Sequence, residues 1–156
     1  MLAVVALGSN LGDRLGHLEW AAQQLTVLLT NLRISSIVET DPVGVPDVQP
    51  PYLNAVAIGE PTLSARDMVP ALLALEARRG RTRTSYRGAR TLDLDLILYG
   101  DEVIDEAGVA VPHPRFRERL FVLEPLALLA PDLRDPITGL SVAQLLTAAR
   151  ASGVRS

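Results

Sequence analysis

The stretch Arg90-Thr91-Leu92-Asp93-Leu94-Asp95-Leu96-Ile97-Leu98-Tyr99 alternates leucine with aspartate and then becomes continuously apolar. Side chains along a β-strand point alternately to the two faces of a sheet, so Asp93 and Asp95 share one face, about 6.5–7 Å apart along the backbone. The leucines beside them enter a core on the other face. The stretch therefore predicts a strand over residues 92–99 that carries two neighbouring carboxylates and ends in a turn at Gly100-Asp101.

The segments on either side predict a mixed α and β fold. Strands are expected over residues 2–7, 33–40, 52–60 and 103–104, and helices from about residue 13, over 63–79, over 120–129 and from about residue 141. Ser64 is the expected N-cap of the second helix, and its expected inner face comprises Met68, Leu72, Leu73 and Leu75. Residues 41–51 carry four prolines and a glycine and predict a loop. The order β-α-β-loop-β-α-β favours an α+β sandwich of ferredoxin-like type, with helices packed on a mainly antiparallel sheet.

The composition narrows the chemistry. The 156 residues, 48% of them apolar, suit a single domain over residues 1–156. The chain has no cysteine and no lysine, which excludes thiol nucleophiles, disulfides, Schiff bases and the lysine-containing phosphate loop. The net charge of −3 argues against a general affinity for nucleic acid. No apolar run approaches the roughly 20 residues of a membrane span and no basic leader begins the chain, so we expect a cytoplasmic protein that binds no membrane.

Arginine clusters accompany the two aspartates. Carboxylates on one strand face can hold one or two hard cations, and Mg²⁺ would complete its coordination with waters and substrate phosphates. The preceding segment carries Arg78, Arg79, Arg81, Arg83, Arg87 and Arg90, whose mutual repulsion calls for an anionic partner such as a polyphosphate. A second group of phosphate contacts is expected from His113, Arg115, Arg117 and Arg119. The competing interpretation is an exposed strand face beside a solvated basic loop.

A flat, neutral substrate would need stacking faces and a few polar groups at its edge. Tyr52, Asn54 and Phe121 are the candidates, although each taken alone is more typical of core packing. Glu76, on the helix before the arginines, is interpreted either as an active-site acid or as an ion-pair partner for arginine, with a helix-surface charge as the default.

Four motifs together resemble the hydroxymethyldihydropterin pyrophosphokinases. They are Ala6-Leu7-Gly8-Ser9-Asn10-Leu11-Gly12, Pro50-Pro51-Tyr52-Leu53-Asn54-Ala55, Gly80-Arg81 leading to Arg90-Thr91-Leu92-Asp93-Leu94-Asp95, and Val111-Pro112-His113-Pro114-Arg115. They follow the family's order and span nearly the whole chain. The resemblance implies a three-layer version of the ferredoxin-like fold. It also implies Mg-dependent transfer of pyrophosphate from ATP to 6-hydroxymethyl-7,8-dihydropterin, with release of AMP, in folate biosynthesis.

The resemblance assigns a role to each matching residue. Asp93 and Asp95 would hold two Mg²⁺ ions, and the catalytic set would comprise Arg81, Arg83, Arg90, Asp93 and Asp95. The expected ATP site comprises Glu76, Arg81, Arg90, Leu96, His113 and Arg119. The expected pterin site comprises Thr40, Val43, Tyr52, Asn54 and Phe121, with Tyr52 and Phe121 on the two faces of the ring. The segment between Gly80 and Arg90 is one residue shorter than in the best-known members, and Arg87 replaces a tryptophan there.

Two other functions compete with this interpretation. A metal-dependent nucleotidyltransferase or nuclease could use the same aspartates on a nucleic acid, but it predicts a broad basic track. An RNA-binding module of ferredoxin-like fold would need exposed aromatic residues on its central strands, where this chain offers aspartates. We therefore expect a monomer whose partners are ATP and the pterin, and which binds no nucleic acid.

Overall fold

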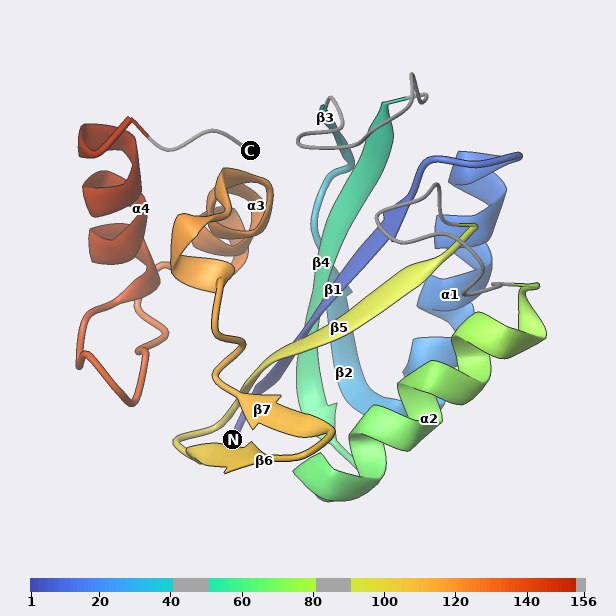
Figure 1. Ribbon diagram of the computed structural model, residues 1–156, viewed down its shortest axis with the longest axis horizontal. Coiled ribbons are helices and arrows are strands. Elements are labelled where there is room, and N and C mark those ends of the chain that lie inside the picture. The colour runs from blue at the N-terminus through green and yellow to red at the C-terminus, as the bar shows by residue number, and fades with distance from the viewer. Residues whose placement is uncertain (41–50, 81–90, 154–156) are drawn as a thin grey trace.

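The computed structural model describes residues 1–40, 51–80 and 91–153. Its elements in chain order are β1 (Ala3–Ser9), α1 (Arg14–Leu28), β2 (Leu29–Ile34), β3 (Val38–Thr40), β4 (Tyr52–Pro61), α2 (Ala65–Arg78), β5 (Asp93–Tyr99), β6 (Ile104–Glu106), β7 (Val109–Val111), the 3₁₀ turn η1 (Phe116–Glu118), α3 (Leu120–Leu129) and α4 (Val142–Ala151). Figure 1 shows a twisted sheet with α1 and α2 on one face and α3 and α4 on the other. The expected α+β sandwich with helices on both faces is therefore confirmed. None of the helices in the described ranges has the length and apolarity needed to cross a bilayer.

The main sheet is antiparallel throughout the described part of the chain. Its strand order is β2-β4-β1-β5, and β3 also pairs with β4. The prediction of one continuous strand over residues 33–40 is wrong, because the chain leaves the sheet between β2 and β3. In the interrupted segment, Ser35 hydrogen-bonds to β4. Its backbone N–H donates to the Val56 carbonyl at 2.8 Å, and its hydroxyl accepts from the Val56 N–H at 2.9 Å. β1 also runs on to Ser9, beyond the expected end at residue 7.

Strand alternation divides the apolar side chains into two cores. Leu94 and Leu96 of β5 lie in the first core, under α1 and α2, as the sequence predicts. Ile97 and Leu98 both lie in the second core, under α3 and α4. These two consecutive residues lie on the same face because the pairing of β5 with β1 shifts register at this point. Val4 pairs with Leu98, while Val5 pairs with Leu96. The aspartates of β5 consequently face the second layer, at the end of the strand where that layer leaves them partly exposed.

Helix α2 has its predicted N-cap and spans Ala65–Arg78 within the expected range 63–79, but the direction of one side chain differs from the prediction. The Ser64 hydroxyl accepts from the Asp67 N–H at 3.2 Å, and Gly80 follows the helix with a positive φ of 86°. Met68, Leu72 and Leu75 face the first core. The placement of Leu73 on the inner face is wrong, since its side chain is 41% exposed. The next residue along a helix lies about 100° further around the axis, so Leu72 and Leu73 do not share a face.

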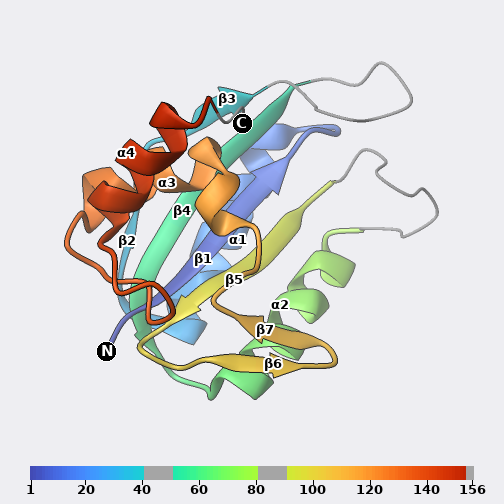
Figure 2. The same cartoon turned by 60° about the vertical axis from the view of Figure 1, so that its left-hand side comes forward.

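The chain after β5 forms a hairpin that the sequence did not reveal. The expected short strand at residues 103–104 is instead the hairpin β6–β7, whose turn contains Gly108 at a positive φ of 83°. Figure 2 shows this hairpin beside α2 and the end of β5. The following turn attaches to the open edge of β5, because the His113 N–H donates to the Ile97 carbonyl at 2.8 Å. Helix α3 has the predicted bounds, and α4 begins after Ser141 with a capping box to Gln144.

Candidate active site

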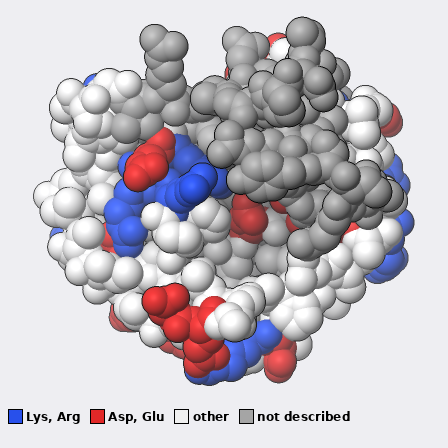
Figure 3. Space-filling model, in the orientation of Figure 1, with Lys and Arg blue, Asp and Glu red and all other residues white. Residues whose placement is uncertain are grey.

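A pocket of about 610 Å³ opens at the edge of β5, between α2, the β6–β7 hairpin and the segment that leads into α3. Its lining includes these residues of the predicted site: Tyr52, Glu76, Asp93, Asp95, Leu96, His113 and Arg119. Figure 3 shows acidic side chains in a hollow on this face and basic side chains beside it. The fold thus brings together residues that lie up to 67 positions apart in the sequence, from Tyr52 to Arg119.

The two aspartates lie above small neighbours on the adjacent strand. Asp93 pairs with Gly8 of β1 and Asp95 pairs with Ala6, so no large side chain on β1 covers the carboxylates. Both aspartates are partly exposed, whereas Leu94 between them is buried. Arg119, at the start of α3, approaches the aspartates from the helical layer that they face, with Nη1 3.9 Å from Asp95 Oδ2. This geometry places two anionic oxygen ligands and a cation at the floor of the pocket.

Glu76 is a buried acid at the edge of the sheet. Only 2% of it is exposed, so the default interpretation as a helix-surface charge is wrong. Its position four residues after Leu72 turns it toward β5, where Oε2 accepts a 2.7 Å hydrogen bond from the Leu94 N–H. Because β5 has no neighbouring strand on that side within the described ranges, Glu76 supplies an acceptor that a sixth strand would otherwise provide.

His113 is a neutral hydrogen-bond donor in this pocket. Burial lowers the pKa of its ring to about 4, with Arg119 and Arg115 adding to the effect and Asp93 opposing it. Nδ1 accepts a hydrogen bond from the Arg115 N–H at 3.1 Å. The proton of the neutral ring is therefore on Nε2, which can donate to an anionic oxygen.

The arginines that follow His113 take different directions. Arg119 lines the pocket, and its guanidinium lies 5.6 Å from the centre of the Phe121 ring. Arg117 turns away and binds the carboxylate of Asp135 through Nε and Nη2, at 2.5 and 2.9 Å. Arg117 was expected within the second group of phosphate contacts, but in this structure its guanidinium is paired with the buried carboxylate of Asp135 and does not line the pocket. Arg115 is exposed and is not part of the pocket wall.

The residues expected to bind a flat ring lie on one face of the sheet. Asn54 of β4 and Asp93 of β5 flank Gly8 on the strand between them. A Cβ atom at position 8 would lie 3.3 Å from Asn54 Oδ1 and 3.8 Å from Cδ1 of Tyr52, so glycine leaves the space beside them open. The Asn54 amide donates to Thr40 Oγ1 at 2.8 Å, which fixes its orientation. Tyr52 lines the pocket, while Phe121 packs against the second core next to it.

The sequence prediction and the described site differ in extent. Val43, Arg81, Arg83, Arg87 and Arg90 lie outside the described residues. The wall that the sequence did not indicate comprises Val69, Leu72 and Leu73 of α2 together with Glu106, Gly108, Val109 and Ala110 of the hairpin. The glycine at position 108, before the apolar residues 109–111, was the available signal for a turn there. Leu96 contributes to the wall from a side chain that is itself part of the first core.

Comparisons with known proteins agree on one family. The family model described as 7,8-dihydro-6-hydroxymethylpterin-pyrophosphokinase (HPPK) matches residues 4–131. The 2-amino-4-hydroxy-6-hydroxymethyldihydropteridine pyrophosphokinase of Synechocystis is 41% identical over 146 residues, which are 92% of this chain and 74% of that protein. The protein of the same name from Pseudomonas aeruginosa is 40% identical over 152 residues, covering 96% of this chain and 93% of the relative.

Solved structures share the fold. A crystal structure titled as an HPPK-DHPS in complex with substrates matches with a TM-score of 0.77 at 12% identity, over 97% of this chain and 44% of that one. The wild-type HPPK-DHPS of Plasmodium falciparum matches with a TM-score of 0.73 at 12% identity, over 94% of this chain and 44% of that one. This chain therefore spans less than half the length of those solved proteins. With the family model matched over residues 4–131 and two relatives at 40% identity or more, the chain belongs to the 7,8-dihydro-6-hydroxymethylpterin-pyrophosphokinase family.

Proposed function

We propose that this chain transfers the pyrophosphoryl group of ATP to the hydroxyl group of 6-hydroxymethyl-7,8-dihydropterin, giving the pterin diphosphate and AMP for folate biosynthesis. The observation that carries the proposal is the row of Asn54, Gly8 and Asp93 across three adjacent strands, with Asp95 and Arg119 beside it. The Asn54 amide, which can bind a neutral ring, therefore lies close to the carboxylates of Asp93 and Asp95, which can bind a metal-polyphosphate complex. The names of the relatives support the same reaction.

The donor groups fit magnesium. Asp93 and Asp95 offer oxygen ligands only, and no group of three or more His, Cys, Asp or Glu side chains in the described ranges forms a full cage. Mg²⁺ is commonly held by one or two carboxylates while waters and substrate phosphates fill its other positions. Asp93 and Asp95 would hold two such ions, which would neutralise charge on the phosphates. His113 and Arg119, with Arg81 and Arg90 from the segment outside the described residues, would then contact the phosphates.

The transfer requires little covalent chemistry from the protein. A bond forms between the pterin hydroxyl oxygen and the β-phosphorus, the bond from that phosphorus to the bridging oxygen breaks, and that oxygen leaves on AMP. The hydroxyl proton is released as the new ester forms. Arg119 and the Nε2–H of His113 can stabilise charge that spreads over the phosphate oxygens, so positioning and electrostatics supply most of the rate. Tyr52 and Phe121 would stack on the pterin, and Asn54 with Thr40 and Val43 would bind its polar edge.

The remaining parts of the proposal concern the whole protein. We propose a cytoplasmic monomer whose residues 1–156 fold as one pyrophosphokinase domain, with Glu76 and Leu96 bordering the ATP. Neither the nucleotidyltransferase or nuclease alternative nor the RNA-binding alternative is favoured by the family match. Sedimentation velocity would test the monomer.

The test is pterin-dependent formation of AMP. Purified protein with Mg-ATP should release AMP only when the pterin is added. Asp93→Asn and Asp95→Asn should each lower the rate by about 100-fold or more, because each removes a negatively charged ligand of the magnesium ions. Asp101→Asn, at an exposed turn after β5, is the matched control and should retain the wild-type rate. A folded wild-type protein that binds ATP but forms no AMP with the pterin would refute the proposal.

A further inference from the structure

Asp135 is a buried carboxylate outside the pocket. It lies in the loop between α3 and α4 with 0% exposed. Its oxygens accept two hydrogen bonds from Arg117, one from the Ile137 N–H at 3.0 Å and one from the Thr138 hydroxyl at 2.8 Å. Burial alone would raise the pKa of Asp135, but the bonds from Arg117, Ile137 and Thr138 outweigh it and hold the pKa below its usual value. The carboxylate is thus charged and tied to two segments of the chain.

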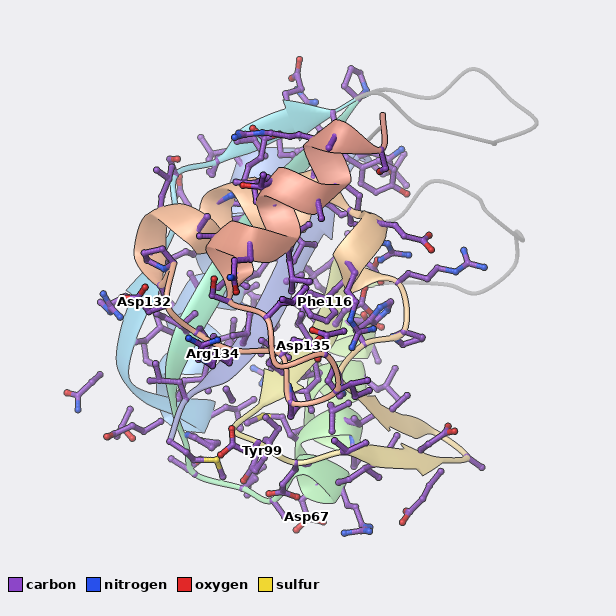
Figure 4. All side chains as sticks on the ribbon, turned by 90° about the vertical axis from the view of Figure 1, so that its left-hand side faces the viewer. Asp67, Tyr99, Phe116, Asp132, Arg134 and Asp135 are labelled. Carbon is purple, nitrogen blue, oxygen red and sulfur yellow. The ribbon has the colours of Figure 1, made fainter. Side chains whose placement is uncertain are left out.

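One of those segments is the turn η1, which leads directly to the pocket. Figure 4 shows Asp135 in its loop beside Phe116, the first residue of η1. Phe116 is fully buried in the second core, and the Arg117 guanidinium lies 4.8 Å from the centre of its ring. Arg117 is therefore held by a two-pronged ion pair on one side and an aromatic ring on the other.

Arg119 follows two residues later, and backbone hydrogen bonds connect it to the same turn. Its N–H donates to the Phe116 carbonyl at 3.2 Å, and its carbonyl accepts from the Val122 and Leu123 N–H groups at 3.0 and 2.9 Å. The backbone of Arg119 is therefore fixed between η1 and the first turn of α3. Its side chain contacts Asp95 and Phe121, whereas that of Arg117 contacts Asp135. A shift of η1 would move the guanidinium within the pocket.

We propose that Asp135 is a positioning residue for the phosphate site, which acts through Arg117 and η1 to hold Arg119 at the floor of the pocket. The inference rests on the proposed function, because it requires that Arg119 contacts a polyphosphate. Asp135 itself touches no substrate. If the role of Asp135 were purely structural, its ion pair with Arg117 would stabilise the position of α4 but would not affect nucleotide affinity.

A double-mutant cycle separates these two roles. Binding of the Mg²⁺ complex of α,β-methylene-ATP, whose α–β methylene bridge cannot be cleaved, would be measured by calorimetry for wild type, Asp135→Asn, Arg119→Ala and the double variant. Asp135→Asn should weaken binding about 10-fold, in the range found for residues that orient a binding group. In the Arg119→Ala background it should cause no further loss, because the group it positions is gone.

The control is Asp132→Asn, an exposed aspartate in the same loop that Figure 4 shows away from Phe116. It should bind the nucleotide as the wild type does. Arg117→Lys keeps the charge but loses the planar guanidinium, so it should weaken binding less than Asp135→Asn does. If Asp135→Asn does not fold, Arg117→Lys takes its place in the double-mutant cycle.

Two results would overturn the inference. One is wild-type affinity in folded Asp135→Asn, or in Arg117→Lys where that variant carries the cycle. The other is an equal loss of affinity with and without Arg119, which would make the role of Asp135 structural only. Failure of the wild type to bind the analogue would instead refute the proposed function, and the inference with it.

Discussion

At the scale of single residues, His113 shows how burial selects a protonation state. The folded protein holds the pKa of its ring at about 4, below the ordinary value of 6.5. Between pH 4 and 6.5 the unfolded chain therefore binds more protons at this position than the folded protein does. Stability contributed by the neutral ring is fully present above pH 6.5 and is lost as the pH falls toward 4. The ring thus remains an Nε2–H donor throughout the neutral range.

We expect two measurements to show this. In an NMR titration, the ring of His113 should stay neutral down to about pH 5, since its pKa lies near 4. In urea unfolding, the free energy of unfolding should fall between pH 7 and pH 5 by more in the wild type than in His113→Gln, which has no ring to protonate. A His113 pKa near 6.5, or an equal pH dependence in both proteins, would contradict the neutral donor.

Residue positions were predictable from the sequence where one strand or helix decides them. Alternation along β5 was enough to place Asp93 and Asp95 on one face and Leu94 and Leu96 on the other, but it did not predict that the register shift would put Leu98 in the second core. The directions of Arg117 and Glu76 were not predictable, because their partners are the Asp135 carboxylate and the Leu94 N–H, 18 residues away in each case. Local periodicity carries no information about which distant group completes a hydrogen bond.

At the scale of elements, the open edge of β5 depends on groups supplied by α2 and by the turn after β7. The Glu76 carboxylate accepts from the Leu94 N–H, and the His113 N–H donates to the Ile97 carbonyl. An edge strand left without such partners would expose its backbone groups at the pocket. Glu76 therefore has a structural contribution that is separable from any contact with the nucleotide.

Truncating Glu76 should destabilise the protein. Glu76→Ala leaves the buried Leu94 N–H without this acceptor and should lower the free energy of unfolding by about 1–3 kcal/mol. Glu76→Gln retains an acceptor oxygen and should cost less. Glu19→Ala, at an exposed site of α1, is the control and should change stability by less than about 0.5 kcal/mol. Urea denaturation would measure all three, and equal stabilities of the Ala and Gln variants would contradict the role of this hydrogen bond.

Element prediction succeeded where caps and turns are written locally. The helix expected from about residue 141 is α4, which begins at Val142, and the helix expected over residues 120–129 is α3 with its observed bounds. It failed at the 33–40 strand, because the break there is stabilised by the contact of Ser35 with Val56 on another strand. It also failed for the β6–β7 hairpin, whose three-residue strands are too short to show a period.

At the scale of the whole molecule, one sheet separates two cores and belongs to both. β4 contributes Ala57 to the first core and Val56 and Ile58 to the second, so unfolding of the sheet would disrupt both cores. The pocket lies at the edge of that shared sheet and takes residues from each layer, Glu76 from α2 and Arg119 from the start of α3. A single cooperative domain is what such sharing predicts.

Mutations in the two layers should therefore shift the same unfolding transition. Met68→Ala in the first core and Leu123→Ala in the second each remove a side chain that is fully buried, and each should lower the free energy of unfolding by about 2–5 kcal/mol.

Two spectroscopic probes would show whether the layers unfold together. The sole tryptophan, Trp20, packs against the first core and reports on that layer, whereas far-UV circular dichroism reports on all elements. If the layers unfold together, Leu123→Ala will move the Trp20 fluorescence midpoint in urea as far as it moves the dichroism midpoint. Leu128→Ala, on the same helix but 79% exposed, should leave both midpoints in place. A Trp20 transition unmoved by Leu123→Ala would mean that the α1–α2 layer and the α3–α4 layer unfold independently.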